Sequence, residues 1–307
     1  MIRYLRHTEI DKALWDKTIA ESANGLVYAC SWYLDVLCPA QWDAIVEDDY
    51  KSVFPLPRRK KAGISYIYTP FFVQQLGAFS GIVPGGEKIN LFLNAIPEEF
   101  RLVELNLNTC NHATCAGFHF VENQNFELSL AQPYEQLQRN YSENLIRNLR
   151  KTVGHSLLMN RDEQTGSIID LFRSEKGMEI KHWGEKEYGV FKGLLSECSE
   201  RGLLKVWGAY IENKLCAGII FLVSPGRVIF LFSATNEIAR ASGAMARLID
   251  RFINENAGRN LILDFEGSNE EGLARFYRSF GAQKTVYQRA VRNSLPGWIN
   301  FLRKLRG

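Results

Sequence analysis

Residues 261–282 read LILDFEGSNEEGLARFYRSFGA. The apolar run that opens this stretch predicts a strand over Leu261–Glu266. The apolar residues that follow recur at helical spacing, so we expect a helix over Glu270–Phe280, ended by Gly281. A second strand is predicted over Thr285–Val291. This succession of strand, helix and strand is typical of a mixed α/β domain.

Two carboxylates end the first of these strands on the same face. Side chains alternate along a strand, so Asp264 and Glu266 project together, about 7 Å apart, at the end where open α/β sheets place ligand sites. Crowding can raise the pKa of one carboxyl group toward neutrality, which makes that group a usable general base. In the alternative interpretation, Ser268 or Asn269 caps the next helix and both acids pair with arginines of that helix. The sequence leaves both interpretations open.

The rest of the second half extends this pattern to the order β-β-β-α-β-α-β. Three apolar runs predict strands, and a segment with a regular apolar face predicts a helix that Asn256 and Gly258 end. The strands are Val206–Ile211, Leu215–Val223 and Val228–Phe232, and the helix is Gly243–Asn256.

The first half repeats this order in a weaker form. Its predicted elements are the strands Trp42–Val46 and Val53–Leu56, the helix Glu87–Ala95 and the strand Leu102–Leu107. Since the distance along the chain from hairpin to late strand is similar in both halves, we expect two similar domains in tandem. We predict an N-terminal domain over residues 1–133, an interdomain helix over 134–153 and a C-terminal domain over 154–307.

The composition is that of an ordinary folded protein. The chain has 307 residues, of which 46% are hydrophobic and 23% charged, which excludes disordered, collagen-like and fibrous classes. Its longest apolar run, Leu215–Val223, is far shorter than the roughly 20 residues of a membrane-spanning helix. The N-terminal residues do not read as a secretory signal, so we predict a cytoplasmic protein.

Motifs for metals, phosphate loops and serine hydrolases are missing from the sequence. The irregular spacing of the six cysteines predicts free thiols rather than a disulfide framework. Cys110, His112, Cys115 and His119 fit no common zinc spacing, so we predict no metal site. There is neither a Walker-type loop nor a Gly-x-Ser-x-Gly elbow, which argues against nucleotidases and hydrolases.

Two basic segments could meet anionic partners. The helix predicted over 134–153 has one apolar face, and its other face carries Arg139, Arg147, Arg150 and Lys151. That face could bind phosphates, such as those of tRNA, or be simply solvated. Residues 283–307 contain basic residues and no acid, and an apolar stripe begins at Pro296. This tail predicts either weak contact with a membrane surface or a terminal helix docked on the protein.

The stretch Leu273–Ala282 resembles the helix-to-glycine signature of the GNAT acyltransferase superfamily. Together with Asp264–Ser268 it looks more narrowly like the Fem-type peptidoglycan aminoacyltransferases, which consist of two GNAT-like domains in tandem. The first half is similar to this group at Ser31–Leu34, Pro55–Pro57 and Gln74–Gly77. The resemblance implies two tandem GNAT-like domains with mixed central sheets, and acyl-transfer chemistry in the second.

The resemblance also implies catalytic roles. In many GNAT enzymes a tyrosine of this helix protonates the leaving thiolate, and Tyr277 matches it, whereas Fem-type enzymes tend to carry a lysine. Glu266 or Asp264 would then be the base, and a backbone N–H near Phe232–Ala234 would polarise the carbonyl. The alternative for Tyr277 is an aromatic side chain packed under the sheet.

GNAT enzymes hold the pyrophosphate of coenzyme A at a helix N-terminus, and the matching residues here are Arg240–Met245. Met245 stands where these enzymes have a small residue, so the coenzyme A site is in question. Two alternative acyl donors therefore remain, acyl-CoA and aminoacyl-tRNA. The candidate cofactor-binding residues are Arg240, Ser242, Gly243, Ala244, Phe232 and Ser233. The candidate substrate-binding residues are Ser268, Arg147, Gln74 and Gln75.

These observations predict an enzyme that moves an acyl or aminoacyl group from a thioester or ester donor to an amine acceptor. One alternative is Fem-type transfer from aminoacyl-tRNA to a cell-wall precursor. The other is a degenerate, non-catalytic pair of GNAT domains that serves as a binding module.

Overall fold

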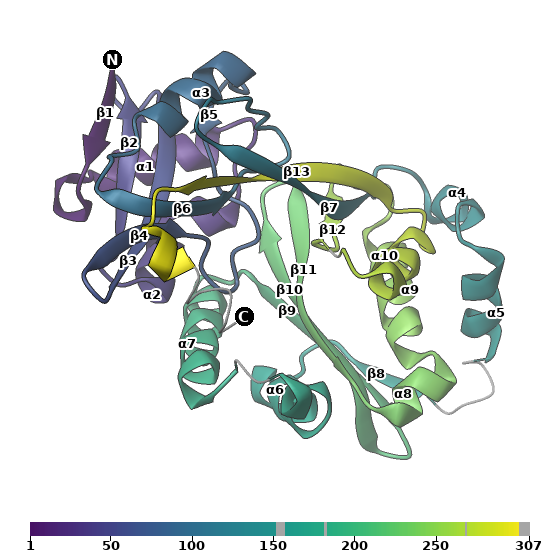
Figure 1. Ribbon diagram of the computed structural model, residues 1–307. Coiled ribbons are helices and arrows are strands. Elements are labelled where there is room, and N and C mark those ends of the chain that lie inside the picture. Colours follow the sequence, from purple (N-terminus) through teal and green to yellow (C-terminus); the bar gives the residue numbers. More distant parts are fainter. Residues whose placement is uncertain (152–156, 181–182, 268, 301–307) are drawn as a thin grey trace. The chain divides into compact units, whose positions relative to one another are not determined.

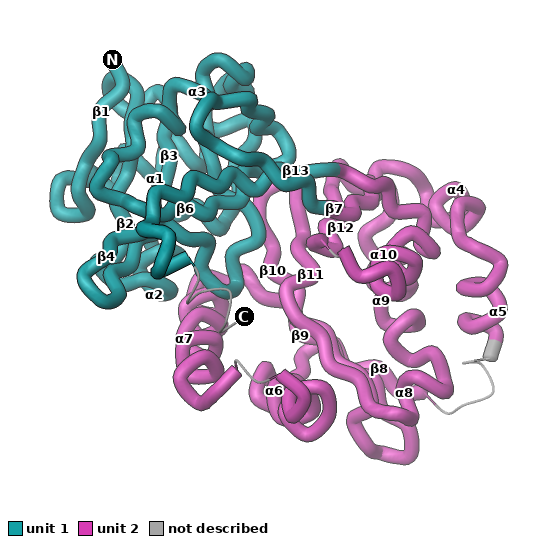
Figure 2. Tube along the Cα trace, in the orientation of Figure 1, with its two compact units in different colours: residues 1–123, 286–307 teal, residues 124–285 magenta. Residues whose placement is uncertain are grey.

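The computed structural model describes residues 1–151, 157–180, 183–267 and 269–300, and the chain forms two compact units (Figures 1 and 2). Unit 1 consists of Met1–Asn123 and Val286–Gly307, and unit 2 consists of Gln124–Thr285. The chain therefore returns to unit 1 for its last segment. These bounds differ from the division at 134–153 expected from the sequence, because the last strand pairs within the sheet of unit 1.

Unit 1 is built on a mixed sheet. Its strand order is β1 (Ile2–Leu5), β2 (Trp42–Glu47), β3 (Ser52–Lys61), β4 (Ile64–Tyr68), β6 (Phe100–Asn106) and β13 (Gln283–Asn293), with β5 (Phe79–Ser80) paired to β3. Neighbouring strands are antiparallel except β4 and β6, which are parallel. Its helices are α1 (Lys12–Glu21), α2 (Ser31–Leu37) and α3 (Gly86–Asn94). Fully buried aromatic rings, among them Trp15, Trp42 and Phe54, form much of the core.

The strands of unit 2 also run in mixed directions. Its strand order is β7 (His119–Ser129), β12 (Ile262–Asp264), β11 (Arg227–Thr235), β10 (Lys214–Ser224), β9 (Leu204–Ile211) and β8 (Leu157–Asn160). Only β11 and β12 are parallel. The helices are α4 (Tyr134–Arg139), α5 (Glu143–Lys151), α6 (Thr165–Ser174), α7 (Glu185–Glu200), α8 (Glu237–Ser242), α9 (Ala244–Asn256) and α10 (Glu271–Arg278). Helices α6 and α7 lie over one face of this sheet, and α9 and α10 lie over the other (Figure 1).

The two units share one succession of elements. In unit 1, the hairpin β3–β4 leads through α3 to β6, which pairs parallel with β4. In unit 2, the hairpin β10–β11 leads through α9 to β12, which pairs parallel with β11. The predicted fold class, two tandem α/β units with mixed central sheets, is confirmed.

The helix predicted over 134–153 is instead two helices, both in unit 2. Helix α4 ends at Arg139, and the Ser142 hydroxyl accepts a hydrogen bond from the Leu145 backbone N–H (3.2 Å), which starts α5 anew. The apolar stripe of the prediction is nevertheless buried in the unit 2 core, at Leu137, Tyr141, Leu145 and Leu149. Local capping therefore breaks a segment that periodicity alone reads as continuous.

Strand β10 is buried on both faces, which explains its uninterrupted apolar sequence. Ile219 and Phe221 point into the main core cluster beside α9, and α6 packs on the other face. There Gly218 lets Ile168 of α6 approach the strand. A Cβ on Gly218 would lie 1.9 Å from Ile168 Cδ1.

We therefore expect Gly218→Ala to lower the free energy of unfolding by about 1–3 kcal/mol, because the core would be overpacked. Urea unfolding measures this change. The matched control is Gly189→Ala on α7, where the added Cβ has nothing within 4 Å and should raise stability by up to about 1 kcal/mol. Equal behaviour of the two variants would contradict the packing of α6 on β10.

Candidate functional site

The candidate site begins where β11 and β12 stop pairing. Their parallel ladder has three residue pairs and ends at Ile229 and Asp264, although β11 continues to Thr235. The chain after β12 stays with β7 instead, since the Phe265 N–H donates to the Phe126 carbonyl (2.9 Å). Within the described residues, no strand pairs with β11 on this side over residues 230–235. The peptide groups of this edge are therefore available to a ligand.

A bulge in β11 lies at the same point. Phe221 and Ile220 of β10 oppose Phe230 and Phe232 of β11, so Leu231 is an extra residue. Phe230 and Phe232, two residues apart, consequently lie on opposite faces of the sheet. The Phe230 ring lies 6.0 Å from that of Phe265, whereas the Phe232 ring lies 4.7 Å from that of Phe172 on α6. The expected cofactor contact at Phe232 is therefore limited to its backbone, because its ring is buried under α6 and α7.

Asp264 is part of a buried ionic cluster. Its Oδ2 lies 2.5 Å from Arg227 Nη1, which also lies 2.9 Å from Glu127 Oε1. Burial raises the pKa of Asp264, and the charge of Arg227 opposes this shift while that of Glu127 adds to it. A carboxylate that is 2% exposed and ion-paired has no access to an acceptor amine. This buried and ion-paired environment does not fit the predicted role of Asp264 as the base.

Glu266 occupies a different environment two residues later. Its backbone has a φ of +59°, a left-handed conformation that costs a non-glycine residue about 1–3 kcal/mol. The other oxygen of Asp264, Oδ1, accepts a hydrogen bond from the Glu266 N–H (2.9 Å), which holds this conformation. Glu266 is half-buried and lies beyond the end of β12. The alternation rule, which put both carboxylates on one face, fails because the strand ends at Asp264.

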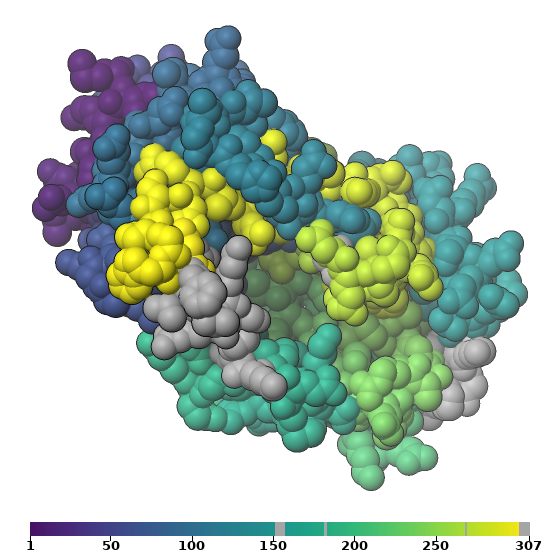
Figure 3. All heavy atoms as spheres, in the orientation of Figure 1, coloured from purple at the N-terminus to yellow at the C-terminus, as the bar shows by residue number. Residues whose placement is uncertain are grey.

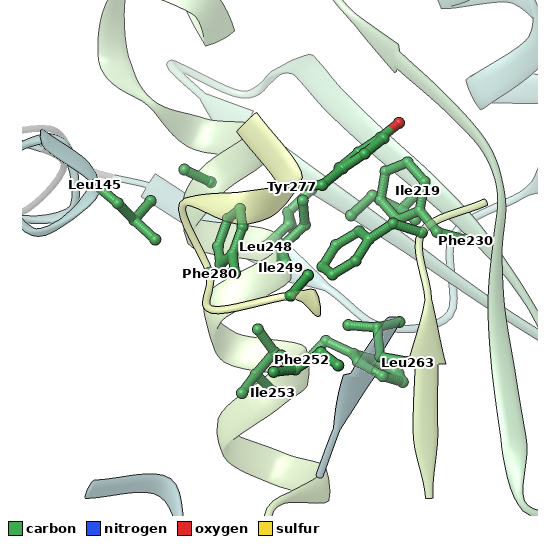
Figure 4. Packing of buried hydrophobic residues seen from close by; sticks show 14 of the residues in the cluster. Leu145, Ile219, Phe230, Leu248, Ile249, Phe252, Ile253, Leu263, Tyr277 and Phe280 are labelled. Atoms are coloured by element: carbon green, nitrogen blue, oxygen red, sulfur yellow. The ribbon is translucent and has the colours of Figure 1, made fainter. Parts of the chain in front are cut away.

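Tyr277 packs from α10 against the end of the same strand. Its ring stacks on Phe265 at 5.0 Å, and the residue is 8% exposed. Figure 4 shows its hydroxyl pointing away from the surrounding hydrophobic side chains, while the other face of α10 forms part of the molecular surface in Figure 3. Burial raises the pKa of Tyr277, and the charges of Glu266 and Glu270 raise it further. Tyr277 is thus a core aromatic residue whose hydroxyl stays protonated near neutral pH, and its role as the proton donor stays a prediction.

The start of α9 has the features of an anion site. Gly243, with a φ of +76°, separates α8 from α9, and no side chain caps the first turn of α9. A 13-residue helix with an uncapped first turn presents backbone N–H groups to an anion. Met245 is half-buried and packs against the core cluster, so its bulk is accommodated inside the unit. The half-buried Gly243 therefore suits the predicted cofactor role through its backbone, whereas Ala244 is fully buried.

Two other candidates for the cofactor have different partners. The Ser242 hydroxyl donates to the Ile238 carbonyl of its own helix (2.7 Å). The Arg240 side chain is 55% exposed, donates to the Thr235 carbonyl at the end of β11 (3.3 Å) and lies 3.4 Å from Glu175. Ser233 is half-buried on the open edge of β11. Arg240 and Ser233 thus lie at the site, and Ser242 serves its helix.

The candidate substrate residues are not gathered in one place. Gln75 of unit 1 is 3% exposed, and its side chain accepts from the Thr109 N–H (2.8 Å) and donates to Gln74 (2.6 Å). Both amides therefore hold a loop of unit 1 together. Arg147 is exposed on α5, and Ser268 lies outside the described residues. The sequence analysis did not identify Arg227 and Glu127. Each is a charged residue next to apolar residues at the end of a strand, and this pattern could have indicated them.

The described residues contain neither a candidate metal site nor a candidate membrane span. No group of three or more His, Cys, Asp or Glu side chains there could hold a metal ion. None of the helices among those residues combines the length and apolar character needed to cross a bilayer.

Comparison with known proteins agrees with this geometry. A family model described as "Acetyltransferase (GNAT) domain" matches residues 137–291, about half of the chain and nearly all of unit 2. The chain belongs to the GNAT acetyltransferase family. A comparison with curated proteins finds no significant match.

Solved structures extend the similarity of this GNAT protein to the whole chain. The crystal structure of FemX has a TM-score of 0.64 at 11% identity, covering 93% of this chain and 96% of that one. A tandem GNAT protein from the clavulanic acid biosynthesis pathway has a TM-score of 0.54 at 10% identity, covering 97% and 100%. L-PGS from Bacillus licheniformis also has 0.54 at 10%, covering 97% and 96%. At these identities the likeness shows the fold, which is the Fem-type tandem GNAT arrangement.

We predict that Arg227→Met lowers the free energy of unfolding by about 3–5 kcal/mol at pH 7, because it leaves the buried Asp264 carboxylate without its cation. The pKa of Asp264, already raised by burial, then rises further above its unfolded value. Such a shift destabilises the protein at neutral pH, and the penalty falls as protons bind at lower pH. Part of the loss should therefore be recovered at pH 5.

Urea unfolding at both pH values tests this prediction. The control Arg251→Met removes an exposed ion pair with Glu255 on α9 and should cost less than about 0.5 kcal/mol. A loss for Arg227→Met as small as that of the control would show that the cluster does not stabilise unit 2.

Proposed function

We propose that unit 2 transfers an acyl group from a thioester or ester donor to an amine, with Tyr277 as the proton donor and Glu266 as the base. The family supports acyl transfer to an amine as the general chemistry. The observation that carries the finer assignment is the open edge of β11 beside a protonated tyrosine and a carboxylate in a left-handed turn.

The open edge would bind the donor. An acyl donor with amide groups can hydrogen-bond along residues 230–235 as an added strand does, because within the described residues the edge of β11 that faces away from β10 has no strand partner there. A backbone N–H near Phe232–Ala234 would polarise the carbonyl and stabilise the negative charge that forms on its oxygen. If the donor is acyl-CoA, the first turn of α9 would hold its phosphates, and coenzyme A would supply the activated thioester.

The proton transfers balance with these two side chains. The neutral amine attacks the carbonyl carbon, a C–N bond forms, and the bond to the leaving sulfur or oxygen breaks. Glu266 accepts the proton lost by the amine, directly or through one water. Tyr277 donates its proton to the leaving atom, and its raised pKa ensures that the hydroxyl is protonated at neutral pH.

A second candidate donor is aminoacyl-tRNA, as in Fem-type transfer to a cell-wall precursor. Arg139, Arg147 and Arg150 are exposed on α4 and α5 and have no ion pair within the described residues. Exposed guanidinium groups at the end of α4 and on α5 are suited to phosphates. Acyl transfer from either donor would use the same edge of β11 and the same pair of side chains.

Purified protein with acetyl-CoA and a panel of amines tests the first donor. Coenzyme A at 100 times its dissociation constant should stabilise the fold by about 2.7 kcal/mol, which a rise in melting temperature reports. Release of free thiol then reports turnover. A melting temperature unchanged by coenzyme A, together with a gel shift of charged tRNA, would select the second donor. No response to either donor would favour the non-catalytic binding module.

We expect Tyr277→Phe to slow thiol release by about 10²–10⁴-fold with unchanged coenzyme A binding, because the leaving thiolate loses its proton donor. The matched control is Tyr141→Phe, which removes another buried hydroxyl next to the same core. The control should retain wild-type rates. Because the pKa of Tyr277 is raised above its usual value of about 10, wild-type turnover should not decline through tyrosine ionisation up to pH 9.5.

Glu266→Gln is expected to slow turnover at neutral pH and to regain activity as the pH rises, because more of the acceptor amine is then already deprotonated. A pH–rate profile measures this effect. The comparison variant Glu271→Gln changes an exposed carboxylate on α10 and should keep the wild-type profile. Parallel profiles for wild type and Glu266→Gln would contradict the assignment of the base.

A further inference from the structure

The surface of unit 1 contains a hollow of about 680 Å³, lined only by residues of that unit. Three segments far apart in the sequence form its walls. They are α1, the turn between β2 and β3, and the segment from Ser80 to Lys88 that leads into α3. The proposed reaction uses none of these residues, so the function of the hollow is a separate question.

Hydrogen bonds and an ion pair fix the walls of the hollow. The Tyr50 carbonyl accepts a hydrogen bond from the Thr18 hydroxyl (2.7 Å), and the Tyr50 hydroxyl accepts one from the Asp11 N–H (2.7 Å). Both bonds tie the β2–β3 turn to α1. On the third wall, Lys88 lies 2.8 Å from Glu47. A surface whose parts are already held in place needs little rearrangement to receive a partner.

An apolar loop projects beside the hollow. Ile82 is 84% exposed and Val83 is 44% exposed on the loop just before α3, and Leu14 of α1 is 37% exposed. All three side chains line the hollow. Aliphatic side chains that gather in water at one place are typical of a surface that another protein covers. The same surface therefore holds both an apolar projection and a space that could receive one.

The remaining charges of this surface cancel, which excludes a partner that carries charges of one sign. Lys17 and Glu21 of α1 and Asp49 and Lys51 of the turn all line the hollow and are exposed. None of these four side chains forms an ion pair within the described residues. A surface with two such charges of each sign is complementary to a second copy of itself.

The order of the charges on α1 favours one arrangement of two copies. Lys17 and Glu21 are one turn apart on the same face of the helix, on a stripe that also holds Leu14. Two parallel copies of α1 would bring like charges opposite one another. Antiparallel copies related by a two-fold axis place each Lys17 opposite the partner's Glu21, and the symmetry forms this ion pair twice.

We propose that unit 1 binds a second copy of this chain through this surface, in a two-fold symmetric dimer. Each copy inserts Ile82 and Val83 into the hollow of the other, and the two α1 helices lie antiparallel between them. Three short segments make a small interface, so we expect association in the micromolar range. The dimer does not depend on the acyl-transfer function, because no residue of unit 2 takes part.

Sedimentation equilibrium of the full chain over a range of concentrations tests the dimer. Wild type should change from monomer to dimer with a dissociation constant between about 1 and about 100 µM. Ile82→Asp should weaken dimerisation at least about tenfold, because two charged side chains would enter the apolar contacts. The matched control Met178→Asp changes an apolar side chain of unit 2 that is 77% exposed, and its dissociation constant should stay within about twofold of wild type.

Reversal of charge on α1 tests the arrangement. Lys17→Glu and Glu21→Lys should each weaken self-association about tenfold, because each places like charges opposite one another at two symmetric positions. An equimolar mixture of the two variants should regain wild-type affinity, since every such contact then joins an acid to a base. Misfolded chains would not recover on mixing, so this recovery separates the interface from a folding defect.

Three results would overturn the proposal. The first is a wild-type chain that remains monomeric at about 500 µM. The second is equal dimerisation of wild type and Ile82→Asp, which would place the interface elsewhere. The third is a mixture of Lys17→Glu and Glu21→Lys that associates no better than either variant alone, which would contradict the antiparallel packing of α1.

Discussion

The Asp264 carboxylate joins the sheet of unit 2 to its candidate site. One oxygen pairs with Arg227 at the start of β11, and the other accepts the Glu266 N–H beyond the end of β12. The same residue is thus the last paired position of β12 and the support of the left-handed turn that follows. Burial of the Asp264 carboxylate costs free energy, so the folded state requires both of its partners in place. The divergence of the two strands and the position of Glu266 both depend on it.

The divergence in turn explains the chemistry that unit 2 can support. Parallel strands that separate expose peptide groups of one strand over a short stretch, which a bound acyl donor can pair with. The Leu231 bulge turns Phe230 toward Phe265 and Tyr277 and turns Phe232 toward α6. The aromatic support of Tyr277 and the open edge of β11 are therefore products of one local irregularity.

Much of the fold could be predicted from periodicity. The hairpin of β9 and β10, the strand β11 and the helix α9 all fall where apolar runs and helical spacing place them. The single helix predicted over 134–153 was wrong, because Ser142 starts a second helix while the apolar stripe continues through both helices. Capping is a local hydrogen bond, and a period of 3.6 residues carries no information about it.

The site was harder to predict than the fold. Residue type and the family resemblance favoured Glu266 and Tyr277 as candidates. The alternation of side chains along a strand made Asp264 an equal candidate to Glu266, because that rule assumes a strand that continues to residue 266. The ion pairs that bury Asp264 come from Glu127 and Arg227, which lie far away in the sequence. Gln75 shows the same limit, because its burial against Thr109 depends on how a loop folds back.

We propose that the open edge of β11 and the first turn of α9 bind the donor. Amide hydrogen exchange, measured with and without the donor, tests this most directly. We expect slower exchange at residues 230–235 with either donor, and at residues 244–246 with acyl-CoA. The paired strand β9 should be unchanged. Protection confined to other segments, or unchanged exchange at residues 230–235 with a donor that demonstrably binds, would contradict it.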